Sequence, residues 1–417
     1  MKSLRLLSLC ALFGIAGTLI NHSKACTSFI VSGKATPDGR PFLFKNRDTN
    51  DLNNLMAYFK GPKYDFVGDI SANPKSKSIW FGHNSAGFAI MNTAAYNLNG
   101  KEPSDPQSKS NPDGGCDGLI MKQALGQCAT LKDFENMLDT MAKPLCCNSN
   151  YGVIDANGGC AYYETGNKGY VKFDANDTQV APYGYLVRTN HGFSGDRSMD
   201  KGISRFNAIS GLCLSISDAN QFTVENILTN IPRYLTHGLT KQNLYDNVPA
   251  NSGESSLVAF RDYIPRYLTA SAALIQGVKP GESPLLTVSW TIIGSPMATV
   301  AVPVCITPSG KIPTLLSKDS NGKSPLCNWG LSLKKELFPI TRGEGADYLD
   351  LSKLVNKQGN GIMQKVALIE KEVVAKGQKE IEKARKNGKF DKSIDEYYSW
   401  ADTYITQSYQ SQFPEIF

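Results

Sequence analysis

Residues 25–48 read ACTSFIVSGKATPDGRPFLFKNRD, and this stretch decides the fold. Two runs rich in Val, Ile and Phe flank the turn-rich connector GKATPDG, a pattern typical of a β-hairpin. A turn near residues 37–39 predicts that Cys26 lies opposite a position between about 48 and 51, beside the sequence KNRD. A shift of one residue in this register would change which side chains share a face with Cys26.

The residues before Cys26 are arranged like a cleavable export signal. Lys2 and Arg5 precede an apolar run over residues 6–20, and Ser23 and Ala25 are the small residues that signal cleavage requires. The apolar run is shorter than the roughly 20 residues of a spanning helix, which argues against an uncleaved anchor. We therefore expect residues 1–25 to be removed and the protein to be exported, to the periplasm or beyond, without a membrane span.

The composition excludes several classes of function. The full chain has a formal charge of +6, and Lys2, Arg5 and Lys24 would leave with the signal, so the mature chain is nearly neutral and gives no case for nucleic-acid binding. The cysteine spacing matches no zinc pattern, and we expect neither a metal nor a cofactor. The partner expected is a small molecule, and a homo-oligomer stays possible.

The remainder of the chain alternates short β-rich runs with helical blocks, which predicts mixed α+β layers. Residues 119–141 are typical of two helices, the second starting at a capping box of Thr130 and Asp133. Residues 223–231 and 255–264 are also expected to be helical. The polar loop 97–115 is a possible substrate gate.

The C-terminal tail has a different pattern. Ile362, Val366, Ile369 and Val373 lie on one helix face, and Lys and Glu dominate residues 376–389, as in a solvated amphipathic helix. We expect three segments: a signal peptide over 1–25, a main domain over 26–340, and a helical extension over 341–417 that packs on it.

A cysteine at the new N-terminus has a chemical consequence. Its α-amine, with a reference pKa of about 7.7–8.0, can accept the thiol proton, so that no histidine is needed. Asp48 could hold the ammonium group, and Arg47 or Lys45 would favour the thiolate. Two other fates remain open for Cys26. It could form a disulfide, or it could carry lipid, although Ser23 and Lys24 fit a lipobox poorly.

Several motifs together resemble a known family. The opening stretch, GHNSAGFAIMNTAAYNL (82–98), YGVIDANGGCAYYE (151–164), RTNHG (188–192) and WTIIGSPMATVAVP (290–303) are similar to those of the N-terminal-nucleophile (Ntn) hydrolases. The resemblance is to the acyl-CoA:6-aminopenicillanic-acid acyltransferase-like, or linear amide C–N hydrolase, group. Choloylglycine hydrolase and penicillin V acylase are more distant relatives.

This resemblance implies a four-layer αββα sandwich of two antiparallel sheets with outer helices. It implies that Cys26 attacks a linear amide and forms an acyl-thioester. Asp48 matches an aspartate that interacts with the nucleophile, whereas Lys45 stands where the family has arginine. Since lysine lacks the bidentate fork of arginine, the cation is either Lys45 or Arg47.

The resemblance also suggests other site residues. Asn190 and Asn92 match asparagines that line the oxyanion pocket, since side-chain amides donate to negative charge without titrating. Arg205 matches a downstream catalytic arginine, or it forms a surface ion pair. His191 is a candidate for substrate binding, or a hydrogen-bonded structural histidine.

The sequence therefore predicts an exported N-terminal-cysteine hydrolase of linear N-acyl amides, with possible acyl transfer. Two alternatives remain: a secreted cysteine dipeptidase of the same Ntn type, and a non-enzymatic envelope protein whose Cys26 is lipidated or disulfide-bonded. The sequence does not name the acyl group or the amine, because the shape of the pocket sets specificity.

Overall fold

The computed structural model describes residues 25–99 and 116–417. Ala25 is the one residue of the predicted signal peptide that falls within this part, and most of the predicted gating loop lies outside it.

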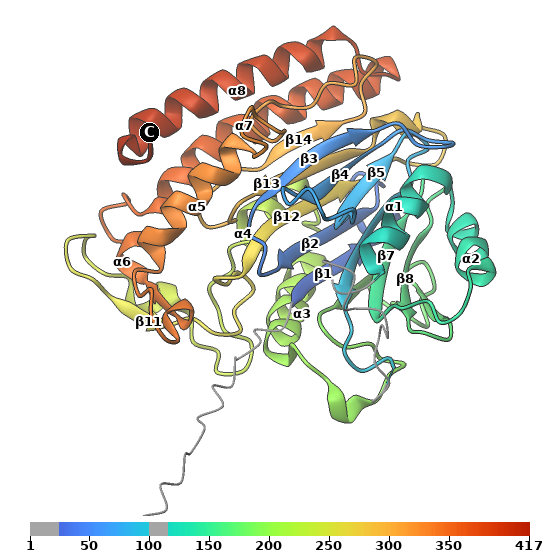
Figure 1. Ribbon diagram of the computed structural model, residues 1–417, viewed down its shortest axis with the longest axis horizontal. Helices are drawn as coiled ribbons and strands as arrows, with labels where there is room; N and C mark the ends of the chain where they lie inside the picture. Colours follow the sequence, from blue (N-terminus) through green and yellow to red (C-terminus); the bar gives the residue numbers. More distant parts are fainter. Residues whose placement is uncertain (1–24, 100–115) are drawn as a thin grey trace, which may run out of the picture.

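Two antiparallel sheets form the centre of the molecule (Figure 1). The first sheet has six strands in the order β10 (Tyr185–Arg188), β1 (Cys26–Val31), β2 (Phe42–Asp48), β12 (Thr269–Gln276), β13 (Val288–Ile293) and β14 (Val302–Cys305). The second is a seven-stranded meander of β3 (Asn54–Phe59), β4 (Phe66–Ser71), β5 (Phe81–Asn84), β6 (Ala89–Ala94), β7 (Ser149–Ile154), β8 (Cys160–Thr165) and β9 (Tyr170–Asp174). Strands β1 and β2 pack on β6, β7 and β8, so the sheets face each other.

Helices cover both outer faces. α1 (Asp117–Gln127) and α2 (Leu131–Thr140) pack on the seven-stranded sheet, where Phe134 contacts Tyr151 and Tyr163. α3 (Ile203–Asp218), α4 (Val224–Asn230) and α7 (Ile362–Asn387) cover the six-stranded sheet. The fold is the αββα sandwich that the sequence predicts.

The first hairpin forms, but with a different register. Cys26 pairs with Arg47, not with a position between 48 and 51. The connector is longer than a tight turn, because Ser32 caps a 3-10 turn, η1 (Gly33–Ala35), by accepting from the amide of Lys34. The centre of the hairpin therefore lies before residues 37–39, and Arg47 shares the face of Cys26.

The predicted helices are confirmed with one exception. α1 and α2 occupy residues 119–141, the capping box of Thr130 and Asp133 forms, and α4 matches residues 223–231. The helix expected over 255–264 is wrong. Residues there form β11 (Leu257–Ala259), which pairs with β15 (Tyr348–Asp350) about ninety residues later in the chain.

The C-terminal helices share the core of the sandwich. α5 (Pro325–Leu337), α6 (Leu351–Leu354), α7 and α8 (Lys392–Gln412) belong to one apolar cluster with strands β12–β14. The predicted apolar face of α7 is buried, and the Lys- and Glu-rich segment continues the same helix to Asn387. The division of the chain at residue 340 stays a prediction.

A buried ion pair holds α7 to the sandwich. Glu370 accepts from both terminal nitrogens of Arg233, each at 2.7 Å, and from the amide of Ala301 at 2.6 Å. We expect Glu370→Gln to lower the free energy of unfolding by about 3 kcal/mol, because it leaves the buried Arg233 without a counter-charge. Urea unfolding measures this, with the exposed Glu372→Gln of the same helix as control. Equal stability of the two variants would contradict the assignment.

Candidate active site

Cys26 is the first residue of β1 and a free thiol, as are the other eight cysteines of the described residues. Its side chain is buried between the sheets, and its nitrogen donates to Asn190 Oδ1 at 3.2 Å. In this chain the nitrogen belongs to the peptide bond with Ala25. If residues 1–25 are removed, the same nitrogen becomes the α-amine, already directed at a hydrogen-bond acceptor.

Arg205 of α3 ties Cys26 to Asn190. Its Nη1 donates to the carbonyl oxygen of Cys26 at 2.5 Å and to Thr27 Oγ1 at 3.0 Å, and its Nη2 donates to Asn190 Oδ1 at 2.6 Å. Burial lowers the pKa of Arg205 to about 10, which leaves the guanidinium charged at neutral pH. The surface ion pair considered for Arg205 is wrong, because the side chain is buried beside Cys26.

Asn190 follows β10 and meets Cys26 through its oxygen. Oδ1 accepts from both Cys26 and Arg205, while Nδ2 donates to the carbonyl of Ala94 at 2.9 Å. The structure thus places Asn190 beside Cys26, while its expected oxyanion role stays a prediction. Its contact there is with the nitrogen of Cys26, and the second hydrogen of Nδ2 is the one left for an oxyanion.

Lys45 and Arg47 both lie on β2, on the same face of the sheet as Cys26 of the neighbouring strand β1. Lys45 Nζ donates to the carbonyl of Trp80 and to Asn92 Oδ1, both at 2.8 Å. Burial lowers the pKa of Lys45 to about 8, although the nearby Cys26 acts in the opposite direction. Arg47, opposite Cys26, stacks 4.5 Å above the Trp80 ring and donates to Asn54 Oδ1.

Asp48 contacts other partners than the resemblance implies. Its Oδ2 accepts from Arg266 Nε at 3.1 Å and Nη2 at 2.5 Å, and its Oδ1 accepts from Thr269 Oγ1 at 2.6 Å. Because side chains alternate along a strand, Asp48 points away from the face shared by Arg47 and Cys26. Asp48 is therefore the counter-ion of Arg266. Among the described residues, the structure shows no hydrogen bond between Asp48 and Cys26.

Comparison with known proteins identifies the family. The model of the family described as acyl-coenzyme A:6-aminopenicillanic acid acyl-transferase matches residues 35–277, more than half of the chain. The chain belongs to this family. The resemblance inferred from the motifs is thereby confirmed, and with it membership of the Ntn-type amide hydrolases. Cys26 lies outside the matched residues.

The solved structures that are similar to this chain have sequence identities of 10–13% to it. A mutant conjugated bile acid hydrolase from Clostridium perfringens has a TM-score of 0.40 at 10% identity, covering 67% of this chain and 92% of its own. A Caenorhabditis elegans N-acylethanolamine-hydrolyzing acid amidase ortholog has a TM-score of 0.36 at 13% identity, and the match covers 62% of this chain and 93% of the ortholog. Penicillin V acylase from Agrobacterium tumefaciens has a TM-score of 0.35 at 13% identity, and the match covers 67% of this chain and 86% of the acylase. A search of curated proteins finds no match.

Asn92 is a hydrogen-bond partner of Lys45. Its Oδ1 accepts from Lys45 Nζ, and its Nδ2 is directed at Ser149 Oγ at 3.0 Å and Asp117 Oδ2 at 3.4 Å. Since both hydrogens of Nδ2 have acceptors, the expected oxyanion role of Asn92 is not supported. The side chain instead fixes the position of the Lys45 ammonium group.

His191 is buried, which favours the hydrogen-bonded structural histidine over the expected substrate-binding role. The ring is buried, with Nδ1 2.9 Å from the carbonyl of Lys201 and its faces against Phe193 and Phe206. Burial lowers the pKa of His191. A ring enclosed in this way presents no surface to a substrate.

Three charged residues near the site were not singled out by sequence reasoning. Arg266 lies three residues before the start of β12, Asp69 lies on β4, and Lys334 lies on α5. Asp69 Oδ2 accepts from Ser271 at 2.9 Å, and burial raises the pKa of Asp69 to about 6. Nothing local in the sequence signals these residues, because they come from a loop, a strand of the other sheet and a helix that are distant in the chain from the hairpin.

No helix among the described residues is long and apolar enough to cross a membrane. Within the same residues, no group of three or more His, Cys, Asp or Glu side chains is arranged to hold a metal ion.

Lys334 provides a test by pH. It is buried, its Nζ donates to the carbonyl of Thr269 at 3.2 Å, and burial lowers its pKa to about 7. Between about pH 7 and about pH 10.4 the unfolded chain binds more protons at this lysine, so the stability contributed here rises with pH. We expect the stability of the native protein relative to Lys334→Met to increase over this range. Urea unfolding at several pH values measures it. The exposed Lys335→Met is the control, and a flat difference would contradict the pKa.

Proposed function

We propose that this protein is an exported N-terminal-cysteine hydrolase that cleaves the C–N bond of a linear N-acyl amide through a thioester on Cys26. The observation that carries the proposal is the contact of the Cys26 nitrogen with Asn190 Oδ1, together with Arg205 on the Cys26 carbonyl. The site is thus built around the main-chain atoms of the cysteine, which is what a nucleophile using its own α-amine requires.

In the acylation step, the α-amine takes the proton of the Cys26 thiol, and the thiolate attacks the amide carbon. A C–S bond forms and the carbonyl oxygen becomes negative. The second hydrogen of Asn190 Nδ2 is the candidate donor to this oxygen. When the C–N bond breaks, the proton passes from the α-ammonium group to the leaving amine.

In the deacylation step, water attacks the thioester and gives its proton to the α-amine. The C–S bond then breaks, and the proton returns to the Cys26 sulfur as the acid leaves. An amine acceptor in place of water would give acyl transfer, the activity in the name of the family. Lys45 is buried on the same face, and its ammonium group interacts electrostatically with Cys26.

The structure supports different roles for the charged residues around this chemistry. Arg205 and Asn190 contact Cys26 and are the candidates that act on the nucleophile. Asp48 and Arg266 form a largely buried ion pair whose arginine interacts electrostatically with Cys26, and Asn92 Oδ1 accepts from Lys45. We assign these three to positioning.

The first test is the mass and N-terminal sequence of the protein purified from the medium or periplasm. A chain that begins with unmodified Cys26 supports both export and the mechanism. Lipid on Cys26, or a chain that begins elsewhere, would overturn the proposal, because the base would be absent.

The second test is a substrate panel. The comparison proteins act on conjugated bile acids, N-acylethanolamines and penicillin V by their names, so one member of each class belongs in the panel. Dipeptides belong in it too, because release of amino acids from them, without release of amine from acylated compounds, would favour the dipeptidase alternative. No turnover on any class, with a free Cys26, would leave the envelope-protein alternative.

A further inference from the structure

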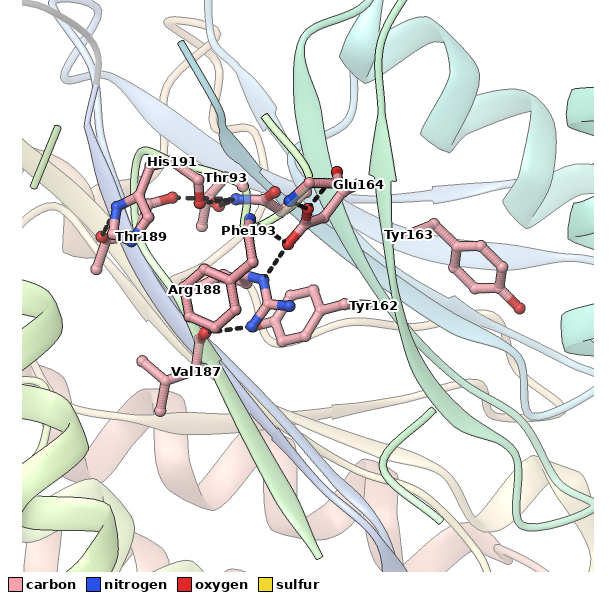
Figure 2. Close-up of polar contacts among 12 residues, drawn as sticks. Thr93, Tyr162, Tyr163, Glu164, Val187, Arg188, Thr189, His191 and Phe193 are labelled. Atoms are coloured by element: carbon pink, nitrogen blue, oxygen red, sulfur yellow. Dashed lines mark hydrogen bonds and ion pairs between the residues drawn. The ribbon is translucent and has the colours of Figure 1, made fainter. Parts of the chain in front are cut away.

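A row of polar side chains crosses the inner face of the seven-stranded sheet next to the site. Thr93 of β6, Asn150 of β7 and Glu164 of β8 are direct neighbours across the strands, and all three are buried. Figure 2 shows Thr93 and Glu164 of this row beside the segment 187–193, which is the end of β10 and the loop after it. That segment contains Asn190, the residue that holds the nitrogen of Cys26.

Glu164 grips the segment on both sides of Asn190. Its Oε1 accepts from Arg188 Nε at 2.7 Å and from the amide of Phe193 at 2.8 Å. Its Oε2 accepts from the amide of Ser194 at 2.7 Å and from Ser194 Oγ at 2.6 Å. Four donors thus converge on one buried carboxylate, two residues before and three to four residues after Asn190.

Aromatic rings fix the arginine of this pair. The guanidinium of Arg188 lies 4.2 Å from the centre of the Phe193 ring, and Figure 2 labels both residues. It lies 4.7 Å from the centre of the Phe173 ring. Nη1 of Arg188 donates to the carbonyl of Val187 at 2.8 Å. The start of the segment therefore has little freedom to rotate.

Asn150 contacts the carbonyl groups of the residues before and after Asn190. Its Nδ2 lies 3.4 Å from the carbonyl of Thr189 and 3.1 Å from that of His191, and 3.0 Å from Thr93 Oγ1. These contacts restrain the backbone on both sides of Asn190, whose side chain contacts the nitrogen of Cys26.

We propose that Glu164 and Asn150 are positioning residues, which set the distance between Asn190 Oδ1 and the Cys26 nitrogen. The inference rests on the proposed function, because it acts through that contact. Stability alone is a weak reason for this arrangement, since an ion pair buried in place of apolar residues contributes little or costs stability. A misplacement of about 1 Å in a site of this kind can lower the rate about a hundredfold.

The test uses the mature protein beginning at Cys26 and the burst of nitrophenol from 4-nitrophenyl acetate, a small acylating ester that demands little of the acyl pocket. Glu164→Gln replaces one acceptor oxygen by a donor, so at least one of the four contacts becomes repulsive. We expect a burst rate about tenfold to a hundredfold lower. In an Asn190→Ala background the same change should cost less than twofold, because the group being positioned is gone.

A purely structural role predicts another result. The losses from Glu164→Gln would then be equal in both backgrounds, and this additivity would overturn the inference. Glu370→Gln is the matched control, because it also removes a charge from a buried Glu–Arg pair. It should lower the melting temperature and leave the burst rate unchanged. If Glu164→Gln does not fold, Asn150→Ala takes its place in the same cycle.

A crystal structure of the folded variant separates this inference from the proposed function. An Asn190 Oδ1 that has moved out of hydrogen-bond reach of Cys26 supports the positioning role, and an unmoved one refutes it, whether or not the native protein gives a burst. Absence of a burst from the native protein would count against the thioester mechanism alone.

Discussion

Replacing Cys26 by alanine in the mature protein is expected to abolish acyl release, with a loss of more than about 10⁴-fold. Without the thiol no thioester can form, and neither Lys45 nor Arg205 can act as nucleophile in its charged form. The fold should persist, since Cys26 pairs with β2 through its main chain and the substitution removes one sulfur atom. The measurement is turnover of the best substrate from the panel, with circular dichroism to verify folding.

The half-buried Cys146→Ser is the control for this experiment, because Cys146 is a free thiol in the loop between α2 and β7 and has no contact with Cys26 among those of the described residues. It should keep full turnover. Serine at position 26 is informative as well, because it is a much poorer nucleophile for the weak α-amine base. Retention of native turnover by Cys26→Ser or Cys26→Ala would refute the mechanism.

Replacing Arg205 by lysine is expected to lower kcat by about 10²- to 10³-fold. The guanidinium spans the Cys26 carbonyl and Asn190 Oδ1 with two separate nitrogens, at 2.5 and 2.6 Å. A lysine ammonium is a point charge on a flexible stem and cannot reproduce this planar fork. Because the charge is kept, the loss reports geometry, and KM should change much less than kcat.

Arg261→Lys is the control for Arg205, since Arg261 is an exposed arginine that pairs with Asp347. Its kcat should equal that of the native protein. A native kcat in Arg205→Lys would remove Arg205 from the catalytic assignment and leave Asn190, on the Cys26 nitrogen, as the side chain that acts on the nucleophile.

The hairpin illustrates what local sequence determines. The apolar runs and the turn-rich connector predict two paired strands, because residues close in the chain need little loop-closure entropy to meet. The register is less secure. Ser32 and the 3-10 turn lengthen the connector, and this small change places Arg47, not Asp48, on the face of Cys26.

Residues 255–264 illustrate the limit of local reasoning for the fold. Their pattern favours a helix, but the backbone of Leu257–Ala259 pairs with Tyr348–Asp350. A strand of three residues at the edge of the molecule takes its conformation from its partner, and the partner is distant in sequence. No local pattern encodes such a pairing.

For the candidate site, too, some features follow from local sequence and others from long-range contacts. The sequence by itself pointed to the candidate nucleophile Cys26 and, through its resemblance to the family, implied the αββα sandwich and the candidates Asn190 and Arg205, because the resemblance depends on motifs that are continuous in the chain. Only the tertiary structure decided that Asp48 pairs with Arg266, that Asn92 holds Lys45, that His191 is enclosed by aromatic rings, and that Glu164 grips the segment of Asn190. The physical reason is that the direction of a buried polar side chain is set by the partner that satisfies it, and here each partner comes from a distant strand or helix.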